Sequence, residues 1–363
     1  MKQTETSPEQ ALVFALLRGE PVIDLHRPDQ QDPDLHRPDQ HRPDLHRPDQ
    51  QNPDLQELYR LFHRHRLFPL SASIQPLLPK HEQEVWKEAR LWRDLHALKL
   101  AAQLEELLPL FREKGIPVRP LKGPELAREL YGDLQQRHMR DLDLLVREEE
   151  LPRALQVLEE AGFQLYSPPK ALSPQGWKRY FRQHYDLGLK HRESGLILEL
   201  HTRLNYPWLL EKGKKLFSGE EGGHEREELF LYLLIHGSHH LYFRLFWLRD
   251  VAEALKRWTL DHDWVLERSL QLGAERMLGL SLELARDIFA SEIPVNYGSL
   301  LEKEKVSLNK LRKRAHRAIR APRFRSPAFR WNVLRFTMQL RPGLRHRWHS
   351  LSSVAVRWWI RNR

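Results

Sequence analysis

The chain has 363 residues, of which 40% are hydrophobic, and its formal net charge is +10. This length allows two or three packed units with cores of their own. The absence of cysteine excludes disulfides, thiolate zinc sites and cysteine nucleophiles. No apolar run approaches the roughly 20 residues of a membrane-spanning helix, and the N-terminal MKQTETSPEQ lacks a signal-peptide pattern. We therefore expect a cytoplasmic protein without a transmembrane segment.

The N-terminal part of the chain contains a short repeat. After a short helix predicted within residues 1–23, residues 24–53 are three copies of a ten-residue unit: DLHRPDQQDP, DLHRPDQHRP and DLHRPDQQNP. Each unit has two prolines and a single leucine, so it cannot bury enough surface to offset its ordering entropy. We predict a disordered insert over residues 24–56 that arose by repeat expansion. His26, His36 and His46 leave weak metal binding as the alternative.

Residues 57–115 have a helical pattern. The stretch HEQEVWKEARLWRDLHALKLAAQLEELLPLFREKG carries apolar residues at helical spacing, and Gly115 marks its end. These apolar residues are Val85, Leu91, Leu95, Leu98, Ala102 and Leu107. The spacing predicts a long amphipathic helix with a structural role.

Residues 116–210 alternate between strand and helix patterns. IPVRPLKG is a short β-like run, and PELARELYGD is a helix with Pro124 at its first position and Gly132 beyond its end. DLDLLV reads as a strand, LPRALQVLEEAGF as a helix, and HYDLGLKHRESGLILELHTRL as two strands joined by a turn. This order predicts an α/β (α+β) core with a small mixed sheet. N-terminal helices and an all-helical domain over residues 211–302 should flank it, with a ligand cleft at the domain interface.

Acidic residues interrupt two of the predicted strands. Side chains alternate along a strand, so Asp141 and Asp143 project from one face, and Glu199 and His201 project together from another strand. If the two strands are neighbours, Asp141, Asp143 and Glu199 form an oxygen site suited to Mg²⁺ or Mn²⁺. Taken alone, the DxD pattern is more often a solvated sheet face.

Two basic groups bear on this prediction. Lys122 and Gly123 stand at a strand–helix junction, where free N–H groups and the helix dipole favour a phosphate group. Arg137 and Arg140 lie just before the DxD pattern, and either could simply pair with a buried Glu199. The Lys122–Gly123 junction, the Asp141/Asp143 pair and Glu199 occur in this order along the chain. Together they indicate a nucleotide site more specifically than any one of them alone.

The stretch LKGPELARELYGDLQQRHMRDLDLLV, followed by LILELHTRL and LLIHGSHHLYFRLFWLRDVAEAL, resembles the uncharacterised nucleotidyltransferase family, a branch of the DNA polymerase β-like nucleotidyltransferase superfamily. The resemblance covers most of residues 55–300. It implies nucleotidyl transfer from an NTP with two Mg²⁺ ions. On this resemblance, Lys122 and Gly123 would hold the triphosphate, Asp141 and Asp143 would bind metal, and Glu199 would be the third acid.

The same resemblance gives further roles and one departure. Arg137 would steady phosphate or the acidic residues, and His201, on the face of Glu199, would contribute to nucleotide binding. The wider superfamily has serine or a second glycine after its glycine, whereas Pro124 follows Gly123 here. Proline removes a hydroxyl and an N–H donor, for which Lys122 could substitute as a phosphate contact.

The motif HGSHHLYFR offers a different site. His236 and His240 are four residues apart, a spacing compatible with zinc, but Gly237 occupies the glutamate position of the HExxH pattern. Packing or polar contacts at the domain cleft are the favoured interpretation of these histidines.

The C-terminal tail, residues 303–363, carries most of the positive charge. It contains 18 Lys and Arg against one acid, Glu304, which leaves a net charge of −7 for the rest of the chain. Its arginines alternate with tryptophans, a composition that suits nucleic acid and an anionic membrane surface equally. The third alternative is a helical extension that docks on the acidic body of the protein.

These observations favour a Mg²⁺-dependent nucleotidyltransferase that moves NMP from an NTP such as ATP to an acceptor, with release of pyrophosphate. The acceptor could be a small molecule, a peptide, a protein or an RNA. The alternative is a noncatalytic nucleotide-binding module that the basic tail tethers to RNA or to an anionic membrane.

Overall fold

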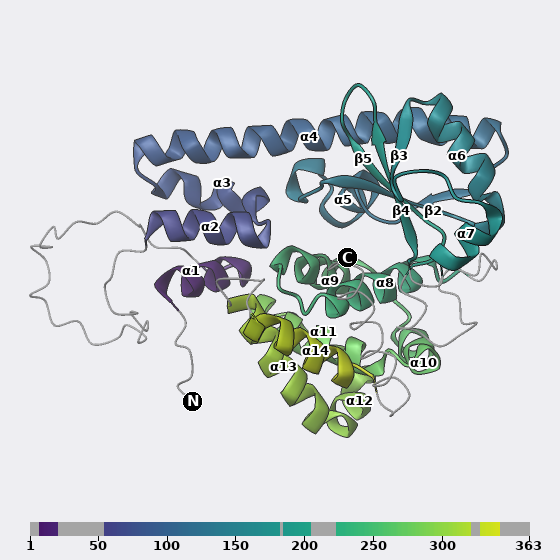
Figure 1. Ribbon diagram of the computed structural model, residues 1–363. Helices are drawn as coiled ribbons and strands as arrows, with labels where there is room; N and C mark the ends of the chain where they lie inside the picture. Colours follow the sequence, from purple (N-terminus) through teal and green to yellow (C-terminus); the bar gives the residue numbers. More distant parts are fainter. Residues whose placement is uncertain (1–6, 21–53, 182–183, 205–222, 321–326, 342–363) are drawn as a thin grey trace, which may run out of the picture.

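The computed structural model describes residues 7–20, 54–181, 184–204, 223–320 and 327–341 (Figure 1). Within these residues the chain forms N-terminal helices, a five-stranded mixed sheet and then a group of helices. The predicted α/β architecture with flanking helices is confirmed. The ten-residue repeats and the last part of the basic tail lie outside the described residues.

The sheet is built from β1 (Val118–Pro120), β2 (Asp141–Val146), β3 (Phe163–Ser167), β4 (Asp186–His191) and β5 (Ile197–His201). Their order is β1-β2-β5-β4-β3, with β2 and β5 parallel and the other neighbours antiparallel. The sequence had predicted four of these strands. Strand β3, which follows a tight turn at Gly162, was not anticipated.

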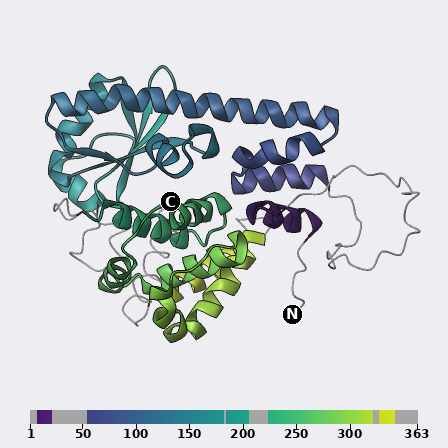
Figure 2. The same cartoon turned by 180° about the vertical axis from the view of Figure 1, so that it is seen from behind.

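Helices α4 (Lys80–Glu113) and α6 (Leu151–Glu160) cover one face of the sheet, and α4 runs along the top of the molecule in Figures 1 and 2. Leucines of β2 and β5 pack against this layer in a single apolar core. Its members include Leu142, Leu144, Leu198 and Leu200 of the strands and Leu100, Leu104, Leu107 and Phe111 of α4. Because strand side chains alternate, the acidic residues between these leucines must face the opposite side.

The sequence correctly predicted that α4 is a helix. Most of the apolar residues on which this prediction rested, however, do not lie on its buried face. Val85, Leu91, Leu95 and Leu98 are between 42% and 55% exposed, and Ala102 is exposed as well. Of the predicted set, only Leu107 is buried. Helix α4 is apolar on two sides, so its periodicity does not reveal which side meets the sheet.

The remaining helices pack together although they come from both ends of the chain. They are α1 (Pro8–Leu17), α2 (Leu55–His65), α3 (Ser71–Ile74), α8 (Glu225–His239), α9 (Leu245–Arg257), α10 (His262–Leu272), α11 (Glu275–Phe289), α12 (Gly298–Lys303), α13 (Lys305–Arg320) and α14 (Pro327–Gln339). Val13 of α1 and Phe62 of α2 belong to the same apolar core as Leu234 of α8 and Leu280 of α11. The N-terminal helices therefore complete the C-terminal helical unit.

Two short helices lie beside the strands. Helix α7 (Pro174–Tyr180) precedes β4, and α5 (Pro124–Tyr131) follows β1. Pro124 is at the start of α5, and Gly132 ends it in the left-handed conformation, as predicted. Short 3-10 turns η1 (Phe68–Leu70), η2 (Gln75–Leu77), η3 (Leu134–Gln136), η4 (Glu148–Glu150) and η5 (Val295–Tyr297) complete the described elements.

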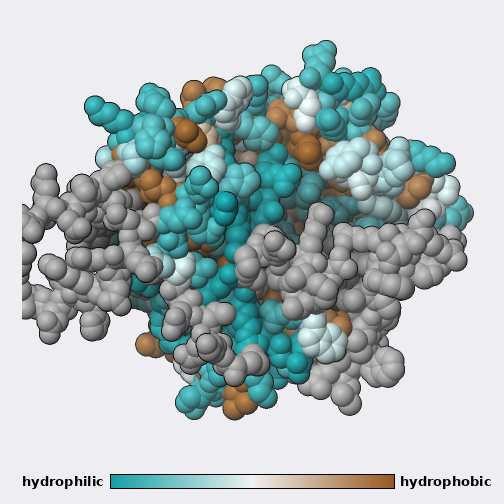
Figure 3. All heavy atoms as spheres, turned by 60° about the vertical axis from the view of Figure 1, so that its left-hand side comes forward, coloured by the Kyte–Doolittle hydropathy of each residue, from teal (hydrophilic) through white to brown (hydrophobic). Residues whose placement is uncertain are grey.

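The described part of the basic tail is helical. Helix α13 packs on α11 through buried residues such as Leu308 and Leu311, and Arg312 forms an ion pair with Glu283 at 2.8 Å. Docking on the protein body is thus what the structure describes for residues 305–320. None of the described helices is long and apolar enough to span a membrane. On the face in Figure 3, hydrophilic side chains prevail between small apolar patches.

Candidate functional site

Strands β2 and β5 bring three ionisable side chains together. In the parallel register Asp143 lies opposite Glu199, and His201 lies two residues further along β5. Each of these residues offers one ligand atom, and the three atoms all lie within 4.8 Å of one another. Among the described residues this is the only such group of His, Asp and Glu. We call Asp143, Glu199 and His201 the acidic group.

Hydrogen bonding within the acidic group centres on Asp143. Its Oδ1 lies 3.1 Å from Nε2 of His201 and 3.4 Å from Nζ of Lys122. Glu199 is further away, with Oε2 at 3.8 Å from His201 Nε2. The Asp143 and His201 side chains are 5% and 2% exposed, whereas that of Glu199 is 35% exposed. A ligand that approaches from solvent would therefore meet Glu199 first.

Lys122 and Gly123 form a corner next to this group. The amide N–H of Leu121 donates to the carbonyl oxygen of Asp143 at 2.9 Å, which holds the corner against β2. Gly123 has φ +74°, and a Cβ atom at this position would lie 3.9 Å from the carbonyl oxygen of Asp141. The left-handed backbone explains the glycine. The corner also begins α5, so the predicted phosphate site and the acidic group are neighbours.

Asp141 stands at the edge of the acidic group. It pairs in register with Ile197, two residues before Asp143, and so projects from the same face of the sheet. It is partly exposed and does not belong to the set of ligand atoms within 4.8 Å. Burial, and next the charge of Asp143, raise the pKa of the Asp141 carboxyl. Its charge thus interacts with the acidic group without a close contact.

The carboxylates respond differently to burial. Burial opposes ionisation of Asp143, but Lys122 and His201 outweigh it and hold the pKa of this carboxyl well below its ordinary value. Burial, followed by the charges of Asp143 and Asp141, raises the pKa of Glu199 to about 7. Protein cations therefore compensate the charge of Asp143. The charge of Glu199 is repelled by the two aspartates, and a bound metal cation would reduce this repulsion.

Of the two cations that face Asp143, His201 is buried and the Lys122 side chain is 12% exposed. Burial lowers the pKa of Lys122, but Asp143 and then Tyr232 more than reverse the effect and raise it. Burial likewise disfavours the charged form of His201, yet its hydrogen bond to Asp143 leaves the pKa raised. Nδ1 of His201 is buried and has no hydrogen-bond partner among the described residues.

Arg137 has a structural partner. Its Nε and Nη2 donate to the carboxylate of Asp250 on α9 at 3.1 and 2.8 Å, and both side chains are almost fully buried. The hydroxyl of Tyr131 donates to the same carboxylate at 2.8 Å. The alternative in which Glu199 pairs with Arg137 is therefore not what the structure contains. A role of Arg137 toward phosphate stays a prediction.

Three tyrosines near the acidic group were not identified from the sequence. Lys122 Nζ lies 5.1 Å from the ring centre of Tyr232, and Tyr185 stacks on His201 at 5.6 Å. A Cβ atom on Gly188, which pairs with Glu199, would lie 2.6 Å from the ring of Tyr166. Nothing in the local sequence marks these residues, because each reaches the site from a different element.

The histidines of the HGSHH motif pack against aromatic rings. His236 lies 4.8 Å from His240, and His240 stacks on Trp247 at 4.8 Å. Neither belongs to a group that could hold a metal ion among the described residues. The packing interpretation is the one that these contacts support.

Comparison with known proteins gives one match. The family model described as uncharacterised nucleotidyltransferase matches residues 51–290, which is more than half of the chain. Neither a curated protein nor a solved structure is significantly similar to the chain. The matched range contains the whole sheet, the acidic group and helices α8 to α11.

Proposed function

Because the chain belongs to the uncharacterised nucleotidyltransferase family, we propose that it transfers NMP from an NTP to an acceptor and releases pyrophosphate. The observation that carries this proposal is the position of the acidic group beside the Lys122–Gly123 corner. A carboxylate cluster next to a phosphate-binding turn is what in-line displacement at phosphorus requires.

The residues fit a divalent metal ion. Asp143, Glu199 and the neighbouring Asp141 supply carboxylate oxygens, the donors that Mg²⁺ and Mn²⁺ prefer. Burial, and after it the charges of the neighbouring aspartates, raise the pKa values of Glu199 and Asp141, and a bound cation would offset both effects. Bound metal ions would neutralise the triphosphate and lower the pKa of the attacking hydroxyl.

The side chains divide the remaining work. The ammonium group of Lys122 and the backbone at Gly123 hold the triphosphate, with the start of α5 behind them. The acceptor oxygen attacks the α-phosphorus, the bond from that phosphorus to the bridging oxygen breaks, and pyrophosphate leaves with the electron pair. Glu199 receives the proton of the acceptor, because it is the most exposed member of the acidic group.

Noncatalytic nucleotide binding is the second candidate function. Asp143 already has two protein cations as partners, Lys122 at 3.4 Å and His201 at 3.1 Å. A site neutralised in this way could hold a nucleotide without completing the transfer. Pro124 points in the same direction, since it removes one N–H donor from the phosphate-binding turn.

A labelled-transfer assay separates the two functions. The full chain is incubated with each α-labelled NTP, Mg²⁺ or Mn²⁺, and cell extract as the source of acceptors. We expect label to enter an acceptor only with metal, and to disappear in the Asp141→Ala/Asp143→Ala variant. The control variant Glu113→Ala/Glu149→Ala removes two exposed carboxylates elsewhere and should transfer as the wild type does. Transfer that persists without Asp141 and Asp143 would refute the site, and NTP binding without any transfer would favour the second function.

A further inference from the structure

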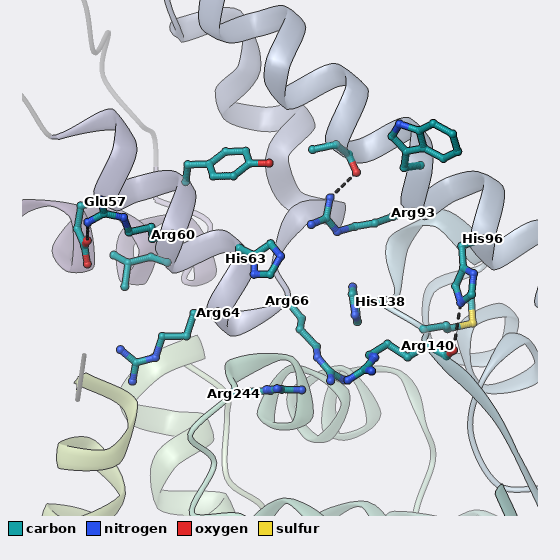
Figure 4. A pocket seen from close by; sticks show the side chains of 15 residues that line it. Glu57, Arg60, His63, Arg64, Arg66, Arg93, His96, His138, Arg140 and Arg244 are labelled. Atoms are coloured by element: carbon teal, nitrogen blue, oxygen red, sulfur yellow. Dashed lines mark hydrogen bonds and ion pairs between the residues drawn. The ribbon is translucent and has the colours of Figure 1, made fainter. Parts of the chain in front are cut away.

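An open cleft of about 1040 Å³ lies away from the acidic group, between α2, the N-terminal half of α4, residues 138–140 and the start of α9 (Figure 4). Its lining is dominated by cationic and imidazole side chains: Arg60, Arg64, Arg66, Arg93, Arg140 and Arg244, with His63, His96 and His138. The one acid in the lining, Glu57, forms an ion pair with Arg60 at 3.2 Å. We call this the arginine cleft.

Three arginines from separate elements converge in the arginine cleft. Figure 4 shows Arg66, Arg140 and Arg244 pointing toward one another, with no acidic side chain of the lining between them. The guanidinium group of Arg66 lies over the ring of Phe246 at 4.8 Å. Nε of Arg244 is buried and has no hydrogen-bond partner among the described residues. Guanidinium groups that point into one space with no acid of the lining between them favour an anion at that place.

The positive potential reaches the histidines of the cleft. Burial, together with Arg93, Arg137 and Arg140, lowers the pKa of His138 to about 3. Nδ1 of His138 is also buried without a hydrogen-bond partner among the described residues. The cleft therefore holds more positive charge than its own residues balance, and it offers polar atoms that a ligand could satisfy.

We infer that the arginine cleft binds the phosphate backbone of a single-stranded nucleic acid. Guanidinium groups match phosphate oxygens in two-point hydrogen bonds, and the converging Arg66, Arg140 and Arg244 suit successive phosphates of one chain. Arg60, Arg64 and Arg93 have partners within the protein and add positive charge around them. The ring of Trp92, which lines the cleft and is 65% exposed, offers a surface on which a base can stack.

The positive surface continues beyond the arginine cleft. Arg64 donates to the carbonyl oxygens of Ala318 and Ile319 at 2.8 and 2.5 Å, which places the end of α13 at the border of the cleft. Along α13, Lys310, Lys313 and Arg317 are exposed at helical spacing. A single small phosphate compound would bind only the converging arginines and would not reach the basic residues of α13. A nucleic-acid strand can extend from the cleft along these residues.

The shape of the cleft argues against a membrane as the ligand. Arg66, Arg93 and Arg244 are partly buried in the hollow. A flat bilayer surface cannot reach recessed cations, while a flexible strand can. This inference goes beyond nucleotidyl transfer and does not depend on it, because binding in the cleft needs neither NTP nor metal.

The test measures the binding of a fluorescent single-stranded oligouridylate to the full chain. Fluorescence anisotropy gives the affinity at a series of KCl concentrations, without NTP or Mg²⁺. The cleft variant is Arg66→Gln/Arg140→Gln/Arg244→Gln. Its matched control, Arg112→Gln/Arg147→Gln/Arg192→Gln, removes the same charge from exposed positions outside the cleft. With about 0.7 counterions released per phosphate contact, the cleft variant should lower the slope of log affinity against log salt by about 2 and weaken binding at least about tenfold.

The controls make each outcome decisive. Equal losses in the two variants would overturn the inference, because they would report general attraction to a basic protein. Competition by inorganic triphosphate at matched phosphate concentration would assign the cleft to a small ligand instead. Binding to phosphatidylserine vesicles without binding to the oligonucleotide would assign it to a membrane. If the triple variant fails to fold by circular dichroism, Arg140→Gln alone, at an exposed position, should still weaken binding.

Discussion

The acidic group and the arginine cleft both concentrate like charges, but they differ in whether the charge at the centre has partners of opposite sign. Asp143 is held between Lys122 and His201, whereas the three arginines that meet in the cleft have no acidic partner in its lining. Charge that is compensated within the fold contributes to a preformed site. Charge that is left without compensation indicates where a ligand of opposite sign completes the structure. The short segment from Arg137 to Asp141 links the two regions, because Arg140 lines the cleft and Asp141 stands at the edge of the acidic group.

The largest effect should come from breaking the ion pair that fixes this segment. Arg137→Leu leaves Asp250 buried without its cation, so we expect a loss of about 3–5 kcal/mol in the free energy of unfolding. Urea denaturation measures it. On the same helix as Asp250, Arg257→Leu removes the exposed partner of Glu253 and should cost no more than about 1 kcal/mol. Similar losses in the two variants would mean that the Arg137–Asp250 pair does not hold the segment.

A smaller effect on stability should come from Mg²⁺, a cation that is expected to bind the acidic group and not the arginine cleft. Under the proposed function Mg²⁺ binds the native acidic group, so Mg²⁺ at about 100 times its dissociation constant should stabilise the fold by about 2.7 kcal/mol. Thermal unfolding with and without Mg²⁺ measures this gain. It should vanish in Glu199→Gln/Asp143→Asn and persist in the cleft variant that lacks Arg66, Arg140 and Arg244. If the cleft variant loses the Mg²⁺ response as well, the two regions are not independent.

The smallest expected effect concerns pH and the arginine cleft. The pKa of His138 is about 3 in the folded protein, below its ordinary value of about 6.5 in an unfolded chain. The unfolded state therefore binds more protons than the folded state. The contribution of His138 to the free energy of unfolding is fully present above about pH 6.5 and is lost as the pH falls below this value. His138→Gln should reduce the loss of stability between pH 7 and pH 5.5 by about 1 kcal/mol.

Urea denaturation at the two pH values tests this prediction. His81→Gln serves as the control, because the His81 side chain is 79% exposed and its replacement should leave the pH dependence unchanged. An identical pH dependence in His138→Gln and the wild type would contradict the lowered pKa of His138.

Features that depend on local sequence could be predicted. Pro124 and Gly132 delimit α5 because proline suits the first turn of a helix and glycine its end. The alternation in DLDLLV and LILELH placed the acids on one face of their strands, and the parallel pairing of β2 with β5 then brought Asp143 next to Glu199. The family resemblance supplied the order of these elements.

Features that depend on contacts between distant segments could not be predicted. Arg137 and Asp250 are 113 residues apart, and no local pattern identifies them as partners. The arginine cleft draws its lining from α2, α4, residues 138–140 and α9, and in the sequence its arginines look like ordinary surface residues. The buried face of α4 was missed for another reason, since both of its apolar sides satisfy the same periodicity.

The length of α4 sets the geometry between the two regions. Its 34 residues make a rod of about 51 Å at 1.5 Å per residue. Arg93 and His96 of this rod line the arginine cleft, while Leu100 and Leu104, one to two turns later, support the strand that bears Asp143. A single residue inserted between His96 and Leu100 would rotate one end against the other by about 100°. Changes in length at this point should therefore be far more damaging than substitutions.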